Sequence, residues 1–411
     1  MLDTELYAQV LGDIRPWRVE RVTLNPQAQA IEVELNCPPQ VWVCPQCHER
    51  AHLHDTERRR WRHLDTCQYQ TLLIADVPRV KCGEHGTVQV RVPWAEPYGR
   101  FTTLFERLAI DLLRECSTSA ACGILRVSWD EADGIKQRAV RRGLARREAV
   151  PVRRLCVDEK AAGHGHDYVT VVSCADTTPA RVLAVEDGRE ERSLNRFWRS
   201  LSKEQRAGVE TVAMDMWDSY RNSTLRFVPD AADKIVYDHF HLARYMNRAV
   251  DEVRRWEQAT ASTDMASSLK GSRQLWLYGW ENVPRKWASR FAELRTRASK
   301  TARAWKVKEL LRSFWSCTDA DDATAYFRQW CRHAMATRLE PVKKVARLFR
   351  RHWANIVTYF RYHLSNAPSE GINSRIQQLV QKACGYRNRS RFKTDILFHL
   401  GGLDLYPAQT P

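Results

Sequence analysis

Apolar residues in the stretch LSNAPSEGINSRI and just beyond it recur with the period of a helix. They follow one another at steps of three and four residues, at Ile372, Ile376, Leu379 and Ala383. Glu370 stands at the head of this predicted helix, and Asn373 follows on the same polar face. Helix capping alone explains a carboxylate in the first turn, because the unpaired N–H groups there attract an anion. A functional role for Glu370 therefore requires partners elsewhere in the chain.

Short apolar runs between residues 154 and 238 predict five strands. Turn residues join the first three runs, RLCVDEK, YVTVVSC and ARVLAV, and the helical stretches REERSLNRFWRSL and DSYRNSTLRF alternate with the last two, VETVAMD and KIVYD. This is the element order of a ribonuclease H-like α/β fold, in which the first and fourth strands are neighbours. We therefore expect Asp158, on the first strand, to lie beside Asp215, at the end of the fourth.

Neighbouring carboxylates repel each other unless a divalent cation binds between them or one of them takes up a proton. Two Mg²⁺ (or Mn²⁺) ions held by Asp158, Asp215 and Glu370 would activate an attacking oxygen and stabilise the leaving oxygen of a phosphodiester. Each acid has a simpler explanation when taken alone, since Asp215 could cap the next helix and Asp158 could pair with Lys160. In this strand order, the three together favour a metal site.

The segment between residues 239 and 362 exceeds what such a fold needs. It is rich in tryptophan and basic residues, and an apolar repeat predicts one amphipathic helix through Val342, Val345, Phe349, Trp353, Ile356 and Phe360. We expect an all-helical insertion whose basic surface lies where DNA would pass. A helical packing domain with a solvated face is compatible with the same pattern.

Two cysteine-containing knuckles in the first hundred residues have the spacing of a structural zinc site. CPQC supplies Cys44 and Cys47, and CGEH supplies Cys82 and His85. The alternating run at 31–35 and the run QTLLIADVPRVKC predict strands around this site, so residues 1–97 are expected to form a zinc-binding β-rich domain. Rival ligands are present at Cys37, His48, His52, His54 and Cys67.

Residues 98–150 have the pattern of a helix-turn-helix. An apolar repeat begins near Phe101, and Ser128 with Glu131 forms a capping box that starts a later, basic helix. The residues expected to contact DNA are Ser128, Trp129, Lys136, Arg138, Arg141 and Arg142. A three-helix packing unit with a solvated basic face is the alternative, and Arg126 occupies a turn position where many such motifs have glycine.

Composition agrees with a nucleic-acid partner. The chain of 411 residues has a net charge of +16, which points to a polyanion, most commonly nucleic acid, although a membrane surface or solubility alone also explains it. It is 44% hydrophobic and 10% aromatic, which excludes a disordered chain. No apolar run reaches the length of a membrane span, and the first residues carry acids where a signal peptide has bases. We therefore expect a cytoplasmic, nucleoid-associated protein whose cysteines are metal ligands or core residues and not disulfides.

Taken together, CPQC with CGEH, LRVSWDEA, VDEK, AMDMWDSY, VYDHFH, SNAPSEGINSRI and GYRNRSRF resemble the DDE transposases of the bacterial insertion-sequence family named IS-L-three. The match covers nearly the whole chain in order. The resemblance implies that Asp158, Asp215 and Glu370 are the catalytic acids, with Asp218 as a backup. It also places Asp238 and His241 in a DxxH signature and suggests an accessory role for them and for Asn373. The CxxH knuckle departs from relatives that often have cysteines there.

The resulting prediction is a multidomain α+β transposase that binds the inverted repeats at the ends of an insertion sequence and catalyses DNA cleavage and strand transfer. Its partners would be double-stranded end and target DNA and at least one further copy of the chain, with no membrane. The domains expected are 1–97 (zinc), 98–150 (helix-turn-helix), 151–238 and 363–411 (catalytic), and 239–362 (insertion). The alternatives are an inactive, domesticated DNA-binding protein and a nuclease on the same fold.

Overall fold

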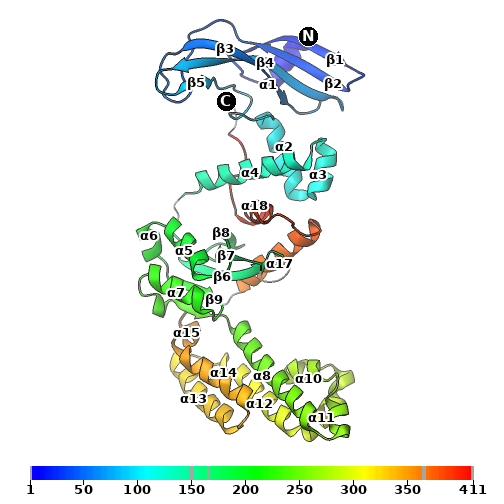
Figure 1. Ribbon diagram of the computed structural model, residues 1–411, viewed down its shortest axis with the longest axis vertical. Coiled ribbons are helices and arrows are strands. Elements are labelled where there is room, and N and C mark those ends of the chain that lie inside the picture. Colours follow the sequence, from blue (N-terminus) through cyan, green and yellow to red (C-terminus); the bar gives the residue numbers. More distant parts are fainter. Residues whose placement is uncertain (1, 149–150, 164–166, 363–366, 409–411) are drawn as a thin grey trace. The chain divides into compact units, whose positions relative to one another are not determined.

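The computed structural model describes residues 2–148, 151–163, 167–362 and 367–408 (Figure 1). The chain forms two compact units. The first contains the residues up to Arg147 together with the segment that begins at Gly402, and the second is Glu148–Gly401. Within the described ranges, no helix is both long and apolar enough to cross a membrane.

The first unit begins with a five-stranded sheet in the order β1-β2-β4-β3, with β5 also paired to β4. The predicted strands at 31–35 and 70–82 are confirmed as parts of β2 and β4, which pair in parallel. Trp17 and Trp61 both pack edge-on against Trp94 and fill the core. The elements are α1 (Asp3–Leu11), β1 (Arg18–Asn25), β2 (Ala30–Asn36), β3 (His52–Arg62), β4 (Gln70–Cys82) and β5 (Gly86–Gln89).

Three helices follow in the same unit: α2 (Thr103–Glu115), α3 (Thr118–Leu125) and α4 (Trp129–Arg146). The predicted capping box is present, because the Ser128 side chain accepts from the Glu131 N–H and the Glu131 carboxylate accepts from the Ser128 N–H. Arg126 ends α3 in the left-handed region with φ 54°, so it takes the conformation for which glycine is usual. Its guanidinium compensates by donating to the Gln68 carbonyl (2.9 Å) and pairing with Asp65.

The second unit is built on a five-stranded mixed sheet in the order β10-β9-β6-β7-β8. Strand β6 is antiparallel to β7 and parallel to β9, so the predicted first and fourth strands are neighbours. The strands are β6 (Arg154–Ala161), β7 (Tyr168–Cys174), β8 (Arg181–Asp187), β9 (Thr211–Met214) and β10 (Ile235–Tyr237), and the helices between them are α5 (Glu191–Ser200), α6 (Lys203–Ala207), α7 (Asp218–Phe227) and the short η1 (Ala231–Asp233).

The segment after β10 is entirely helical among the described residues and has an aromatic core. Trp276 packs against Phe291, and Phe327 stacks on Trp353 at 4.1 Å between centroids. One prediction here was wrong: the apolar repeat from Val342 to Phe360 is divided among three helices, with interruptions at His352 and at Thr358. The elements are α8 (His239–Thr260), α9 (Thr263–Leu269), α10 (Arg273–Leu277), η2 (Trp280–Asn282), η3 (Arg285–Trp287), α11 (Ala288–Arg297), α12 (Ser299–Phe314), α13 (Ala320–Ala336), α14 (Glu340–Arg351), α15 (Trp353–Val357) and α16 (Tyr359–Tyr362).

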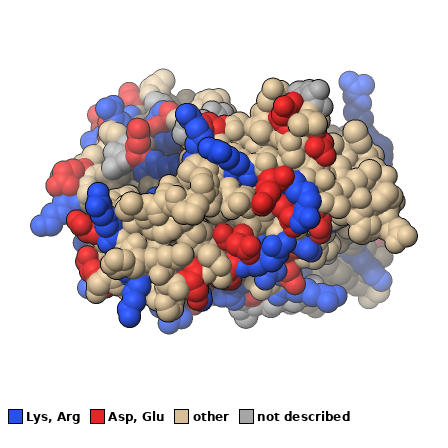
Figure 2. Space-filling view, turned by 90° about the horizontal axis from the view of Figure 1, so that it is seen from above, with Lys and Arg blue, Asp and Glu red and all other residues tan. Residues whose placement is uncertain are grey.

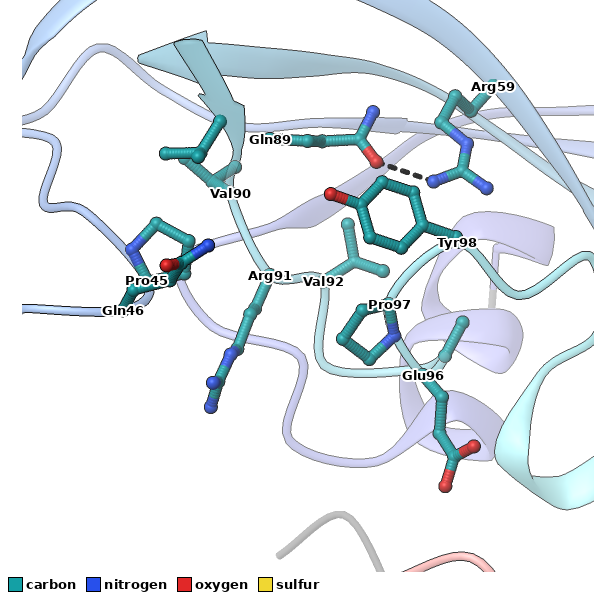
Figure 3. A pocket seen from close by; sticks show the side chains of 12 residues that line it. Pro45, Gln46, Arg59, Gln89, Val90, Arg91, Val92, Glu96, Pro97 and Tyr98 are labelled. Atoms are coloured by element: carbon teal, nitrogen blue, oxygen red, sulfur yellow. Dashed lines mark hydrogen bonds between the residues drawn. The ribbon is translucent and has the colours of Figure 1, made fainter. Parts of the chain in front are cut away.

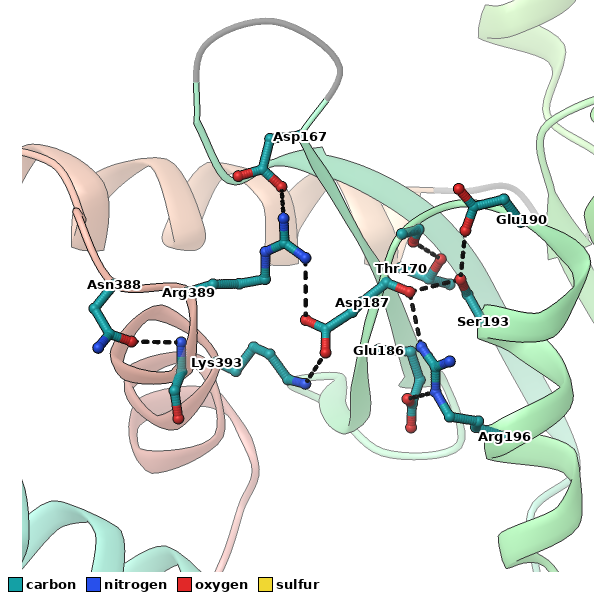
Figure 4. A network of polar contacts seen from close by, with 12 residues as sticks. Asp167, Thr170, Glu186, Asp187, Glu190, Ser193, Arg196, Asn388, Arg389 and Lys393 are labelled. Carbon is teal, nitrogen blue, oxygen red and sulfur yellow. Dashed lines mark hydrogen bonds and ion pairs between the residues drawn. The ribbon is translucent and has the colours of Figure 1, made fainter.

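Helices α17 (Ala367–Lys382) and α18 (Arg389–Leu400) return to the sheet. The apolar face predicted for the first of them is confirmed, since Ile372 and Ile376 are buried against valines of β7 and β8. Figure 4 shows how charge holds α18 at this edge: Arg389 and Lys393 both pair with Asp187, and Arg389 also pairs with Asp167.

The final segment differs from the expected domain boundary, because from Gly402 onward it belongs to the first unit. Arg142 donates to the Leu405 carbonyl at 3.0 Å, and the Tyr406 hydroxyl donates to Asp111 at 2.6 Å. These contacts join residues more than 250 positions apart, which no local sequence pattern reveals.

Candidate active site and zinc-binding site

Two aspartates of neighbouring parallel strands meet at one edge of the second sheet. Val157 of β6 pairs with Met214 of β9, so the residues that follow, Asp158 and Asp215, are side by side. Asp158 is buried, and this burial, together with the charge of Asp215, raises the pKa of Asp158 to about 6. The predicted adjacency of the two carboxylates is therefore present, and it has the electrostatic cost that a cation would relieve.

His241 links Asp215 to a third carboxylate. Its Nδ1 lies 2.6 Å from Asp215 Oδ1 and 2.8 Å from Asp238 Oδ2. Burial opposes the charge of the imidazole, but the hydrogen bonds and charges of the two aspartates outweigh it and raise the pKa of His241 to about 10. Asp238 follows β10 and His241 lies in the first turn of α8, so the DxxH signature connects the sheet to the helical segment.

This cluster has the donor set of a cation site. Asp215, Asp238 and His241 have ligand atoms within 4.8 Å of one another. The single hydrogen on His241 Nδ1 faces both Asp238 Oδ2 and Asp215 Oδ1, so the two carboxylates share one donor. Two carboxylates that share one hydrogen-bond donor fit a hard divalent cation, which prefers oxygen ligands.

Two side chains on either side of Glu370 attach α17 to β6. The buried Ser369 hydrogen-bonds the Cys156 thiol, and the Asn373 amide donates to Asp158 Oδ2 at 2.5 Å. Glu370 itself is exposed in the first turn of the helix, and the described cluster of close ligand atoms includes neither it nor Asp158. The helix thus carries Glu370 to the side of the sheet where Asp158 lies. Sequence reasoning named Asn373 only as an accessory residue and missed Ser369.

The four residues of the two knuckles come together in the first unit. Cys47 Sγ lies 3.6 Å from Cys82 Sγ, and His85 Nδ1 lies 3.7 Å from Cys44 Sγ and 3.6 Å from Cys82 Sγ. A tetrahedral zinc with Zn–S bonds of about 2.3 Å requires ligand atoms separated by roughly 3.5 to 3.8 Å. Backbone N–H groups of the knuckles, led by those of Cys47 and His85, lower the pKa of Cys44 and Cys82, which favours thiolates. The geometry fits zinc without movement.

A hollow of about 140 Å³ lies beside this zinc-binding site (Figure 3). Pro45 and Gln46, from inside the first knuckle, form one side of it, and Tyr98 lies across from them. Arg59 donates to the Gln89 side chain at 2.5 Å on the far wall. The knuckle thus borders a hollow lined by both polar and apolar side chains of the sheet domain.

Three of the cations expected to contact DNA have partners inside the first unit. Lys136 is only 4% exposed, and Arg138 pairs with Glu106 at 2.5 Å. Arg142 pairs with Glu96 at 2.6 Å and with Glu106 at 3.3 Å. The structure therefore differs from the expected row of groove-facing cations, because this face of α4 packs against the carboxylate of α2.

The remaining predicted DNA contacts are accessible. Trp129 is 49% exposed at the start of α4, Arg141 is exposed, and Ser128 is exposed although its hydroxyl caps the helix. On the face drawn in Figure 2, basic and acidic side chains are intermixed and do not separate into one basic area. The high net charge alone therefore does not locate a DNA surface.

Sequence reasoning also missed a pocket of about 190 Å³ next to Asp215. Its lining includes Asp215, Trp217, His241, Arg189, Arg244 and Arg248. A weak signal was available, since His241, Arg244 and Arg248 follow helical steps of three and four residues. No pattern in the sequence places Arg189 beside them.

The folds and sites described above, which are a cysteine-rich sheet domain, a helix-turn-helix and an acidic cluster on a mixed sheet, define a DNA transposase. The family model for the DDE transposases of the ISL3 (IS-L-three) family matches residues 155–396. The model of the zinc-finger of transposases IS204/IS1001/IS1096/IS1165 matches residues 40–85, and the helix-turn-helix domain of transposase family ISL3 matches residues 90–140. The chain belongs to the ISL3 family of transposases.

Curated relatives agree over most of the chain. It is similar to the transposase for insertion sequence element IS1001 of Bordetella parapertussis, with 26% identity over 398 residues, which is 95% of this chain and 97% of that protein. It is also 27% identical over 371 residues to the transposase for insertion sequence element IS1557 of Mycobacterium tuberculosis, covering 84% of this chain and 82% of that protein. The protein is therefore a DDE-type transposase with a zinc ribbon and a DNA-binding helix-turn-helix.

Proposed function

We propose that the protein binds the terminal inverted repeats of its own insertion sequence and cuts and joins DNA with Asp158, Asp215 and Glu370 as its catalytic acids. The observation that carries this proposal is the adjacency of Asp158 and Asp215 on neighbouring parallel strands. The attachment of α17 through Asn373 supports Glu370 as the third acid, because it fixes the helix that carries this residue beside Asp158.

The three acids would hold two Mg²⁺ or Mn²⁺ ions, which would supply the positive charge that activates an attacking oxygen and stabilises a leaving one. Water attacks the phosphodiester at each end of the element and releases a 3′ hydroxyl. That hydroxyl then attacks a target phosphodiester, and the bond to the target's own 3′ oxygen breaks. The chain's part is to hold the acids: His241 fixes Asp215, and Asn373 fixes Asp158.

The remaining assignments complete the proposal. The sheet is a ribonuclease H-like catalytic core made from 151–238 and the helices after 363, interrupted by the insertion at 239–362. The structural zinc is held by Cys44, Cys47, Cys82 and His85. DNA is contacted by Ser128, Trp129 and Arg141. The other three predicted contacts, Lys136, Arg138 and Arg142, pack within the first unit and hold the recognition helix in place. Pairing of two ends requires at least a dimer in the active complex, which acts in the nucleoid.

The test is cleavage and strand transfer of DNA that carries the ends flanking the gene, with Mg²⁺ or Mn²⁺. Glu370→Gln is expected to bind the ends normally and to cut more than about 100-fold more slowly. Loss of a residue that only orients a metal ligand typically costs up to about 100-fold in activity, so loss of a ligand itself should cost more. Glu340→Gln is the matched control, because it makes the same change at another exposed acid in the first turn of a helix.

Each other outcome identifies an alternative. Equal activity of Glu370→Gln and the wild type would make Glu370 a helix cap and refute its catalytic role. Cutting without joining would support a nuclease, and binding without cutting by the wild type would support a domesticated DNA-binding protein.

A further inference from the structure

The pocket beside Asp215 has an excess of positive charge on one wall. Arg244 and Arg248 are exposed on α8, and neither forms an ion pair within the described part of the chain. The acids of the same pocket are already engaged: Glu159 pairs with Arg189 at 3.5 Å, and Asp215 is held by His241. The two arginines are therefore the cations of the pocket that have their hydrogen-bond donors free for a ligand.

Helix geometry places these two arginines in one stripe that starts at the acidic cluster. His241, Arg244 and Arg248 follow steps of three and four residues along α8, so their side chains project on the same side of the helix. With a rise of 1.5 Å per residue, Arg248 lies roughly 10 Å further along the helix axis than His241. Arg244 and Arg248 lie about 6 Å apart along the axis, so a ligand that contacts both extends along α8 away from the acids.

A third arginine, Arg189, lines the same pocket and is held by aromatic rings. The Arg189 guanidinium lies between the rings of Tyr168 (4.4 Å) and Trp217 (5.1 Å), and the Trp217 indole N–H donates to the Arg189 carbonyl at 3.0 Å. A guanidinium stacked in this way loses little conformational entropy when it binds a further group. The pocket is therefore lined by one arginine held by aromatic rings and by two exposed arginines.

We propose that this pocket binds the sugar–phosphate backbone next to the cleaved bond, with Arg244 and Arg248 each contacting a phosphate on one side of the scissile position. This inference rests on the proposed function, because it takes Asp215 as a catalytic acid. An extended polyanion is the ligand that matches two exposed guanidinium groups in line with an acidic cluster, since arginine binds phosphate through parallel N–H···O bonds. The arginines are binding residues that set which phosphodiester reaches the acids.

The experiment combines protein variants with neutral phosphates in a double-mutant cycle. Arg244→Gln and Arg248→Gln are compared with the wild type on end DNA in which single phosphates flanking the cut are replaced by methylphosphonates. Each variant is expected to lower the single-turnover cleavage rate roughly 10- to 100-fold, the usual range for a lost hydrogen bond to a charged group. For each variant there should be one phosphate position at which the methylphosphonate does not lower the cleavage rate further, because the arginine that contacts that phosphate is already absent.

Arg226→Gln is the matched control, since it removes the same charge from an exposed position of α7 in the same unit but outside the pocket. It should remain sensitive to every methylphosphonate that affects the wild type. Circular dichroism of all variants checks that the exposed substitutions leave the fold unchanged.

The possible failures are distinguishable. Additive effects of variant and methylphosphonate at every position, or wild-type cleavage by both variants, would overturn the phosphate contacts while leaving the proposed function intact. If Asp215→Asn cut as fast as the wild type, or the wild type did not cut at all, the proposed function would fail. In that case the same pairs of variants and methylphosphonates would be compared by their affinity for end DNA. A methylphosphonate that lowers the affinity of the wild type but not of one arginine variant would show that the pocket binds phosphate.

Discussion

The hydrogen bond between Asn373 and Asp158 can be removed by Asn373→Leu, which keeps the number and branching of the side-chain heavy atoms. The Asn373 amide donates to Asp158 Oδ2 at 2.5 Å, and Asp158 is 8% exposed. The substitution leaves this carboxylate oxygen without its donor in a site from which water is largely excluded. Such a loss costs about 1–3 kcal/mol, which corresponds to roughly a 10- to 100-fold change in any process that depends on it.

Two measurements should register this cost. The free energy of unfolding in urea should fall by about 1–3 kcal/mol. Cleavage of end DNA should slow by about 10- to 100-fold and require more Mg²⁺ for half-maximal rate, because Asp158 is no longer held in place for a cation. Affinity for the DNA ends should stay within about twofold, since the first unit is untouched.

Gln377→Leu is the matched control, because Gln377 is exposed one turn further along the same helix. If Asn373→Leu cut DNA as fast as this control, with the same Mg²⁺ requirement, Asn373 would not position Asp158 and the attachment of α17 would have no part in catalysis. A loss of stability without a change in the Mg²⁺ requirement would assign Asn373 a structural role only.

Two further predictions concern the first unit. Cys82→Ser should lose the zinc and bind DNA ends poorly in Mg²⁺-free buffer, because binding of structural zinc contributes about 10–16 kcal/mol to folding of its domain. Atomic absorption measures the zinc content and fluorescence anisotropy the DNA affinity. A variant that kept one zinc per chain would contradict the prediction. Burial, followed by the charge of Arg62, lowers the pKa of His63 to about 4. The unfolded chain takes up a proton near pH 6.5, so stability should fall by up to about 3 kcal/mol as the pH drops from about 6.5 to about 4. Urea unfolding at pH 7.5 and 4.5 should show a smaller fall for His63→Gln, and equal falls would rule out this effect of His63.

Much of the zinc site and of the strand order could be predicted because their signals are local. Two pairs of ligands two residues apart leave few other geometries, and the structure brings all four residues together. Apolar runs of strand length ending in Asp215 and Asp238 are visible in the sequence, and parallel pairing of β6 with β9 then follows from the order of elements. The capping box at Ser128 is equally local and is present.

Other features could not be predicted because they depend on partners distant in the chain. The charge of Arg142 indicated DNA, yet Glu96 and Glu106 neutralise it inside the first unit. The repeat from Val342 to Phe360 has one period, but packing divides it into three helices. A periodicity records which side of a helix is apolar and does not record where the backbone bends.

The sequence by itself determined the zinc-ribbon region, the strand that carries Asp158 and the family of the protein, because each depends on residues close together or on motifs in a fixed order. Only the tertiary structure decided that His241 joins Asp215 to Asp238, that Asn373 reaches Asp158 across 215 positions, and that the segment after Gly402 packs on the first unit. Hydrogen bonds and ion pairs form between groups that folding brings within about 3 Å, and that proximity is set by the packing of the whole core.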